Sequence, residues 1–290
     1  MDVEQKGNFH MNLRTAVLLL SLAASMVAIV LIKRAHAQDV AAQEPTARGV
    51  NAPVVVELFT SEGCSSCPPA DQLLAKLEVE QPITNVEVIA LEEHVDYWNN
   101  GGWIDPFSSS TATMRQYAYA GALGNGNAYT PQMVVDGQSE FVGSRTGQAR
   151  NVIQQAGSKK KTEVTLTAAE RDKVDNGGKG DKFFLSVGTI PNLSNGDTPE
   201  IWMAITETGL HSNVRGGENS GKDLHHAAVV RKMWKIGATK GSGATSFSSE
   251  ERVKIDPGWK RENIRVVAFL QEKKSKKILG ARIATLQPQS

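Results

Sequence analysis

The stretch that decides the fold is Val54-Val55-Val56-Glu57-Leu58-Phe59-Thr60-Ser61-Glu62-Gly63-Cys64-Ser65-Ser66-Cys67-Pro68-Pro69. Its first six residues form an apolar, β-branched run that predicts a buried strand, and residues 60–63 predict a turn. The two prolines are tolerated in a first helical turn, because the N–H that proline lacks has no partner there. Leu73, Leu74 and Leu77 then follow at helical spacing. The stretch therefore predicts a strand, a turn, two cysteines and a helix.

The chain contains two cysteines, Cys64 and Cys67. A disulfide between them closes a very short loop, so it contributes little to stability. The spacing suits thiol-disulfide exchange, because one thiolate attacks a partner and its neighbour resolves the mixed disulfide. Unpaired N–H groups and the helix dipole at a helix N-terminus lower the pKa of a cysteine placed there. The sequence therefore predicts Cys64 as the nucleophile and Cys67 as the resolving thiol.

A metal site is the alternative interpretation of the same cysteines. Cys-x-x-Cys also occurs as half of a zinc site, and a structural zinc site needs further ligands. No other cysteine is present, so histidines such as His94, His211, His225 and His226 would have to supply them. The alternative site comprises Cys64, Cys67 and His94. The redox interpretation requires no cofactor.

The pattern of an α/β thioredoxin-like domain continues through residue 158. Apolar runs predict strands, capped or amphipathic stretches predict helices, and Asp136-Gly137 predicts a hairpin turn. The strands are expected at 86–91, 132–135 and 140–142, and the helices at 108–120 and 146–156. Thr130-Pro131 stands immediately before the strand at 132–135, where thioredoxin-like proteins have a cis-proline. A cis peptide bond there would present the backbone of Thr130 to an extended substrate, and an ordinary trans proline that opens a strand is the alternative.

Three segments, residues 56–71, 94–98 and 129–133, resemble a bacterial family of exported thioredoxin-like proteins described as a domain of unknown function. The motif ELFTSEGCSSCPPAD carries most of this resemblance, which extends over residues 53–156 and more loosely to 218–226. It implies a thioredoxin-like fold and an exported protein, and it implies no substrate. Ser-Ser stands between the cysteines where ordinary thioredoxins have Gly-Pro, so their reduction potential does not carry over.

Two further residues are candidates for the predicted site. Glu57 precedes the cysteine loop on its strand, as does the buried proton acceptor of ordinary thioredoxins, and we assign it a catalytic role with Cys64 and Cys67. An outward-facing Glu57 is the alternative, because side chains alternate along a strand. Trp98 lies in an aromatic insert before Thr130-Pro131, and we expect these three residues to bind substrate.

Residues 162–290 follow a different pattern, with β-rich runs separated by polar turns. They predict a mainly antiparallel, sandwich-like domain, which makes the whole chain α+β. The runs lie at 162–166, 183–190, 201–207, 227–233, 265–271 and 278–284. Lys159-Lys160-Lys161 marks a linker between the two predicted domains, 53–158 and 162–290. We expect the second domain to bind or position a partner.

The N-terminus predicts export. Lys6 and Arg14 precede an apolar run over residues 16–32, and Ala35-His36-Ala37 matches a signal-peptidase site. Residues 1–37 are therefore a predicted signal peptide, and residues 38–52 a flexible mature N-terminus. The alternative is an uncleaved anchor, which would be the chain's one association with a membrane. Cleavage removes two net positive charges from a chain of net charge +1, so the mature chain has a net charge of −1. This near-neutral charge gives no reason to expect nucleic-acid binding.

The sequence therefore predicts a periplasmic or secreted thiol-disulfide oxidoreductase-like protein whose partner is a protein thiol or disulfide. A copper-handling or other metal-handling protein and a non-enzymatic thioredoxin-like scaffold are the alternatives.

Overall fold

A computed structural model describes residues 51–124, 126–169, 180–190, 193–194, 196–239 and 247–287. Residues 51–290 form one compact unit. The predicted signal peptide lies outside the described residues, as does all but the end of the predicted flexible segment 38–52. Among the helices of the described part, none is long and apolar enough to cross a membrane. Export therefore stays a prediction.

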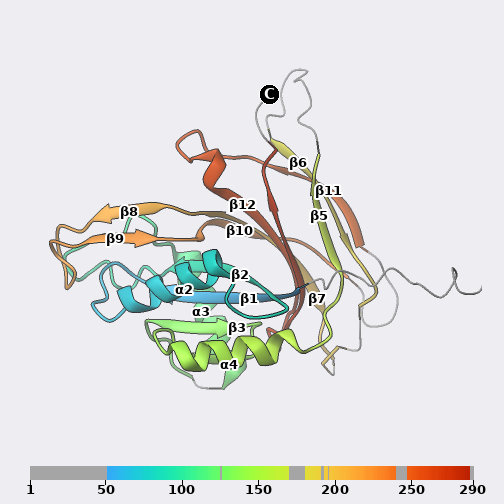
Figure 1. Ribbon diagram of the computed structural model, residues 1–290, viewed down its shortest axis with the longest axis horizontal. Coiled ribbons are helices and arrows are strands. Elements are labelled where there is room, and N and C mark those ends of the chain that lie inside the picture. Colours follow the sequence, from blue (N-terminus) through green and yellow to red (C-terminus); the bar gives the residue numbers. More distant parts are fainter. Residues whose placement is uncertain are drawn as a thin grey trace, which may run out of the picture. The chain divides into compact units, whose positions relative to one another are not determined.

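An eight-stranded sheet with the order β13-β12-β7-β10-β2-β1-β3-β4 forms the centre of this unit (Figure 1). β2 is parallel to both β1 and β10, whereas the other neighbouring strands are antiparallel. The strands are β1 Ala52–Thr60, β2 Val86–His94, β3 Gln132–Val135, β4 Ser139–Val142, β7 Pro199–Glu207, β10 Val229–Ala238, β12 Ile264–Glu272 and β13 Ile278–Thr285.

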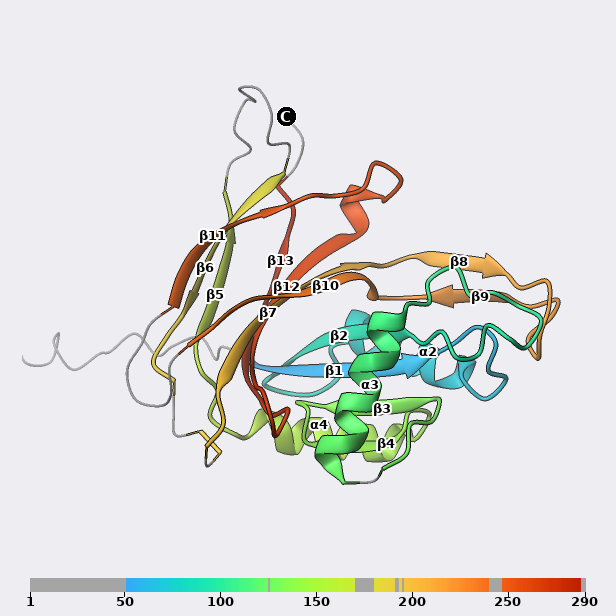
Figure 2. The same ribbon diagram turned by 180° about the vertical axis from the view of Figure 1, so that it is seen from behind.

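Three α-helices of the described residues cover the part of this sheet built from β1 to β4. They are α2 Pro68–Glu80, α3 Ser110–Leu123 and α4 Thr146–Gly157. Side chains alternate between the two faces of β1. Leu58 therefore packs in the core beneath α2 and α4, whereas Phe59 packs against Tyr119 of α3 on the opposite face (Figure 2). This alternation decides which β1 side chains face the cysteine-bearing helix α2.

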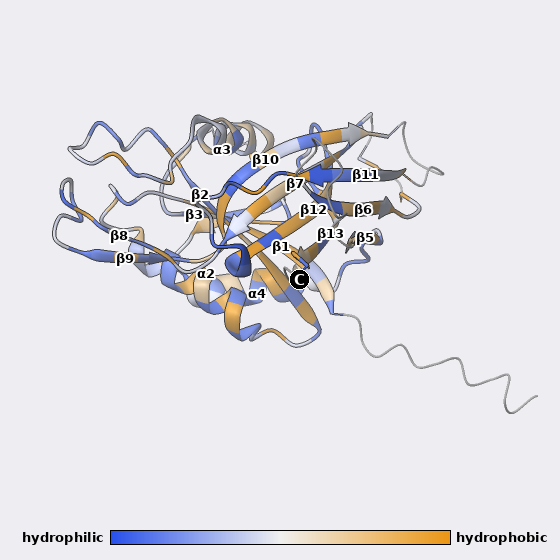
Figure 3. Ribbon diagram, turned by 90° about the horizontal axis from the view of Figure 1, so that it is seen from above, coloured by the Kyte–Doolittle hydropathy of each residue, from blue (hydrophilic) through white to orange (hydrophobic). Residues whose placement is uncertain are grey.

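A three-stranded sheet of β5 Val164–Ala168, β6 Asp181–Val187 and β11 Phe247–Val253 packs against the other end of the large sheet. Phe183 and Leu185 share a buried core there with Met203 and Val266. The hairpin of β8 Leu210–Asn213 and β9 Asp223–His226 extends alongside α2, and its residues are largely hydrophilic (Figure 3). A short 3-10 helix, η1 Arg261–Asn263, precedes β12.

Most of the predicted elements are present, because their signals were local. The structure has strands over 86–94, 132–135 and 139–142, helices over 110–123 and 146–157, and strands near each predicted run of the second half. The predicted separation at residues 158–162 is not seen, since β10 of the second half pairs with β2 of the first at Val229 and Glu92. This pairing satisfies backbone groups of β2 near Glu92, whose N–H donates to the Ala228 carbonyl over 2.9 Å. The two predicted domains thus share one sheet.

Candidate functional site

The cysteine pair lies where β1 passes into α2. β1 ends at Thr60, and Cys67 immediately precedes Pro68, the first residue of α2. Cys64 and Cys67 form a disulfide with their Cα atoms 5.5 Å apart. The backbone N–H of Asp71 donates to the Cys67 carbonyl over 3.2 Å, so Cys67 takes part in the first helical turn. The pair therefore lies at the start of a helix, but Cys67 is the N-cap residue, whereas the sequence predicted Cys64 at the helix N-terminus with Cys67 one turn further in.

Both cysteines are buried although the two serines between them are exposed. Cys64 is 1% exposed and Cys67 is 0% exposed. Ser66 Oγ lies 3.4 Å from Cys64 Sγ, on the outer side of the loop. An external thiolate must reach a disulfide sulfur to exchange with it. Exchange at this disulfide therefore requires local opening around Cys64.

The segment between β8 and β9 holds the cysteine loop in place. Glu218 accepts hydrogen bonds from the Ser65 N–H over 3.0 Å and from Ser65 Oγ over 2.6 Å. These hydrogen bonds lower the pKa of the Glu218 carboxyl. The buried Asn219 donates through Nδ2 to the carbonyls of Glu62 and Cys64, over 2.8 and 2.9 Å. A segment of the second half of the chain therefore lies directly on the cysteine loop.

The predicted substrate-binding residues converge on the same loop. The Thr130–Pro131 peptide bond is cis, as predicted. Trp98 Nε1 donates to Thr130 Oγ1 over 2.8 Å, and a Cβ added at Gly63 would lie 3.2 Å from Trp98 Cβ. Trp98 therefore touches both the loop before Cys64 and the residue before the cis-proline. A substrate-binding role for these residues stays a prediction.

Pro131 also lies close to the start of α2. A Cβ added at Gly143 would lie 3.1 Å from the Ala70 Cβ and 3.3 Å from the Pro131 Cβ. Only a residue without a Cβ leaves room for these groups to approach. The strand that begins after Pro131 is thereby held against the first turn of the cysteine-bearing helix.

Glu57 does not lie where a proton acceptor for the cysteines would be expected. Its side chain is on the α3 face of β1, opposite the face that Leu58 presents to α2. There it accepts hydrogen bonds from Arg115 Nε and Tyr119 Oη and is fully buried. The structure therefore assigns Glu57 to an ion pair in the core, and it does not support the predicted catalytic role.

Asp71 is a buried carboxyl on the cysteine side of the sheet. It lies four residues after Cys67 on α2, and side chains at this spacing share one helix face. Thr60 Oγ1 donates to Asp71 Oδ1 over 2.6 Å. Burial and the nearby negative charge of Glu92 raise the pKa of Asp71 to about 7. A carboxyl with such a pKa exchanges a proton near neutral pH.

A second buried polar cluster lies behind the loop, where β2 meets β9. Glu92 Oε1 is 2.9 Å from His226 Nδ1 and 3.5 Å from His94 Nε2. Glu62 Oε1 lies 3.1 Å from His226 Nε2, and Asp105 Oδ2 lies 2.7 Å from His94 Nδ1. Burial lowers the pKa of the His94 and His226 imidazoles. The neighbouring carboxylates have the larger effect, so the pKa of each histidine is raised above its usual value. The cluster is therefore rich in close, fully buried ligand atoms.

The structure does not assemble the alternative metal site of Cys64, Cys67 and His94. Within the described residues, the side chains whose ligand atoms converge in a metal-sized group are Glu92, His94 and His226. The cysteines are joined to each other, and His94 faces Glu92 and Asp105.

Sequence reasoning missed several of these residues. Asp71 has a local signal, since it stands four positions after Cys67 in a predicted helix. His226 was considered only as a further ligand for the cysteines, and Glu92 was not considered. Their contact has no local signal, because they are 134 positions apart and meet through the pairing of β2 with β10. Asn219 likewise reaches Cys64 over 155 positions.

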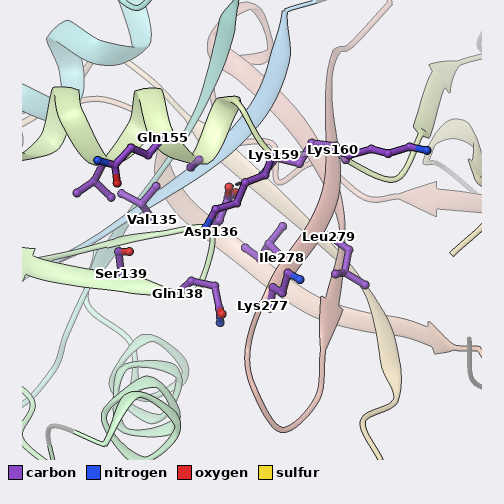
Figure 4. A pocket seen from close by; sticks show the side chains of 13 residues that line it. Val135, Asp136, Gln138, Ser139, Gln155, Lys159, Lys160, Lys277, Ile278 and Leu279 are labelled. Carbon is purple, nitrogen blue, oxygen red and sulfur yellow. Dashed lines mark hydrogen bonds and ion pairs between the residues drawn. The ribbon is translucent and has the colours of Figure 1, made fainter. Parts of the chain in front are cut away.

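A separate pocket of about 170 Å³ lies between the end of α4, the β3–β4 turn and the start of β13 (Figure 4). The predicted linker lysines Lys159 and Lys160 line it, and Lys161 forms an ion pair with Asp136. The ion pair fixes Lys161 to the turn between β3 and β4. The cysteine loop is not part of this pocket.

The fold and the site define a mixed α/β protein with one large sheet and a Cys-x-x-Cys disulfide at the start of a helix. The chain belongs to the family described as "Protein of unknown function (DUF1223)", whose model matches residues 55–271. The match begins in β1 and ends in β12, so it includes strands from both halves of the shared sheet.

One solved structure supports the fold, and the fold alone. Protein AGR_C_4864 from Agrobacterium tumefaciens is 24% identical, with a TM-score of 0.58 over 82% of this chain and 96% of that chain. A domain of the outer membrane lipoprotein Omp28 from Porphyromonas gingivalis is 14% identical, with a TM-score of 0.26 over 45% of this chain and 92% of that chain. The sporulation control protein Spo0M from Bacillus subtilis is 13% identical, with a TM-score of 0.27 over 43% of this chain and 48% of that chain. The comparison with curated proteins found no match.

Proposed function

We propose that the chain is an exported thiol-disulfide exchange protein, with a thioredoxin-like unit at residues 53–158 and Cys64 and Cys67 as its redox pair. The disulfide at the N-terminus of α2 is the observation that carries this proposal. The placement of Trp98, Thr130 and Pro131 beside the same loop supports it, since an extended substrate requires a surface next to the reacting sulfur. The predicted signal peptide supports an oxidising compartment.

In the proposed reaction, a substrate thiolate attacks Cys64 Sγ. The Cys64–Cys67 bond breaks, and Cys67 Sγ leaves with the electron pair and takes a proton. A second substrate thiolate then attacks the substrate sulfur of the mixed disulfide, and Cys64 leaves as a thiolate at the helix N-terminus. The substrate dithiol is oxidised by two electrons, and the cysteine pair is reduced. The reverse sequence reduces a substrate disulfide.

Asp71 is the residue we propose to exchange the proton with Cys67, in place of Glu57. It is buried and lies on the same helix face as Cys67, with a pKa raised chiefly by burial. Such a carboxyl donates a proton to a leaving thiolate and recovers it in the reverse step. An Asp71→Asn variant should therefore form the mixed disulfide at Cys64 more slowly when the pair oxidises a substrate. When the pair reduces a substrate, the variant should resolve the mixed disulfide through Cys67 more slowly.

The proposal is tested by the reduction potential of the pair and by trapping. The purified chain is equilibrated anaerobically with glutathione buffers, and a two-electron transition is expected between roughly −120 and −270 mV. Cys67→Ser should accumulate mixed disulfides with partner proteins, while the matched variant Cys64→Ser should accumulate none.

A pair that is reduced only below about −300 mV, together with no trapped partner, would contradict the proposal. The buried sulfurs would then belong to a structural disulfide in a non-enzymatic scaffold.

A further inference from the structure

We propose that Glu92, His94 and His226 bind a divalent transition-metal ion, for which Zn²⁺ is the probe. This site goes beyond the proposed exchange function, and it uses neither cysteine. Its ligand atoms lie within 4.8 Å of one another, and all three residues are buried. β2 supplies Glu92 and His94, and β9 supplies His226.

The distances between the ligand atoms fit a metal ion. Glu92 Oε1 is 2.9 Å from His226 Nδ1 and 3.5 Å from His94 Nε2. In a tetrahedral zinc site with bonds of about 2.0–2.1 Å, neighbouring ligand atoms are about 3.3 Å apart. The two distances lie on either side of this value. His94 Nε2 and His226 Nδ1 lie within 4.8 Å of each other, so the three atoms can bind one ion after the rings move closer together, with the fourth position left open.

Each histidine has its second ring nitrogen held by a carboxylate. His94 Nδ1 is 2.7 Å from Asp105 Oδ2, which leaves Nε2 facing Glu92. His226 Nε2 is 3.1 Å from Glu62 Oε1, which leaves Nδ1 facing Glu92. A carboxylate behind a metal-binding histidine fixes the ring and its tautomer and makes the ligand more basic. Two such pairs converge here on a single Glu92 oxygen.

The supporting carboxylates are themselves held in place. Glu62 Oε2 accepts a hydrogen bond from Trp103 Nε1 over 2.7 Å, and Asp105 Oδ2 accepts one from the Glu62 N–H over 2.9 Å. The other oxygen of Glu92, Oε2, accepts one from the Ala227 N–H over 2.9 Å. Glu92 Oε1 therefore points at the histidines because Oε2 is already engaged.

One atom of the cluster lacks a hydrogen bond within the described structure. His94 Nε2 is fully buried and makes no hydrogen bond, and Glu92 Oε1 is its ion-pair partner at 3.5 Å. Buried polar atoms are almost always paired, so an unpaired one calls for an explanation. A metal ion bound to Nε2 supplies the missing partner.

The buried charges of the cluster are compatible with a bound divalent ion. Three carboxylates, those of Glu62, Glu92 and Asp105, surround two imidazoles, and the Phe107 ring lies 5.5 Å from both. A buried negative charge requires a compensating positive charge. Two imidazolium ions compensate two of the three charges. A divalent ion bound by both histidines as neutral ligands compensates the same two, so the ion can replace the two protons without changing the net charge of the cluster.

The test measures zinc in the full chain with its disulfide intact, so that the thiols cannot bind. Because the cluster is buried, the protein is unfolded in urea without reductant, refolded with Zn²⁺, desalted and analysed for metal. We expect about one zinc per chain. We also expect an X-ray absorption spectrum with nitrogen and oxygen, and no sulfur, in the first shell.

Variants separate this site from other ligands. His226→Ala and Glu92→Gln should lose the zinc, and a Cys64→Ser/Cys67→Ser double variant should keep it. His225→Ala is the matched control, because His225 is the next residue along β9 and its side chain is 74% exposed. If His226→Ala does not fold, the proposal is tested by two other measurements. They are the zinc content of the near-isosteric Glu92→Gln variant and the X-ray absorption spectrum of the wild type.

Three results would overturn the proposal. The first is a refolded wild type with native circular dichroism and no bound zinc. The second is zinc binding that survives both His226→Ala and Glu92→Gln. The third is sulfur in the first shell or loss of zinc from the cysteine variant. The first would leave the cluster as an ion-pair network, and the exchange function would be unaffected.

Discussion

Removing the Asn219 side chain should accelerate chemical reduction of the Cys64–Cys67 disulfide. Asn219 is fully buried, and its Nδ2 donates to the carbonyls of Glu62 and Cys64 over 2.8 and 2.9 Å. A neutral hydrogen bond contributes a net free energy of about 1 kcal/mol, so the two together hold the loop by about 2 kcal/mol. Since about 1.4 kcal/mol corresponds to a factor of ten, Asn219→Ala should raise the open population about 30-fold.

The assay is anaerobic reduction by excess dithiothreitol at pH 8, followed by alkylation of the freed thiols. When the loop opens and closes faster than the thiol reacts, the reduction rate follows the open population. The rate of Asn219→Ala should therefore exceed that of the wild type by about 30-fold. Asn219→Asp should show at least this increase, because its carboxylate faces two carbonyl oxygens without a hydrogen to donate.

Asn213→Ala is the control, since Asn213 is exposed in strand β8 of the same hairpin. It should reduce at the wild-type rate. Equal rates for Asn219→Ala and the wild type, with both proteins folded by circular dichroism, would refute the inference that this segment restrains the cysteine loop.

Two further substitutions test the buried charges. The folded pKa of Asp71 is raised from 3.8 to about 7, so the folded state holds a proton that the unfolded state releases as the pH rises. Relative to Asp71→Asn, wild type should therefore lose about 2 to 4 kcal/mol of unfolding free energy between pH 4 and pH 8, as measured by urea denaturation; a pH-independent difference would contradict the assigned pKa. Arg115→Met should destabilise the protein by about 3 to 5 kcal/mol, because it leaves Glu57 and Glu93 buried without their cation. Adding Glu57→Gln to Arg115→Met should recover part of this loss, and no recovery would argue against the ion pair.

The parts of the site that were predictable are those encoded by neighbouring residues. The apolar run of β1, the prolines after Cys67 and the leucines of α2 are consecutive in the chain, so they identify a cysteine pair at a helix start. Thr130-Pro131 was predictable for the same reason, since it stands directly before an apolar strand. Backbone propensity and spacing decide such features before any tertiary contact forms.

The unpredicted parts depend on pairing between distant strands. His226 alternates with an exposed neighbour in β9, and its sequence context does not indicate that it will meet Glu92. Side-chain alternation places Glu57 and Leu58 on opposite faces of β1, but it does not say which of these faces α2 covers. The sequence therefore did not determine whether Glu57 faces the cysteine-bearing helix. Arg115 of α3, 58 positions away, decides the outcome by providing the cation.

The two predicted domains share one sheet for a physical reason that also bears on the extent of the family match. Residues 53–158 alone would bury Glu62, Glu92 and His94 without His226, and would leave the cysteine loop without Asn219. They would also expose the edge of β2 that β10 covers. Unpaired buried charge and an open strand edge both favour unfolding or association. A stable cysteine site therefore needs strands from both halves, which accounts for a family match that spans residues 55–271 without a break at the linker lysines.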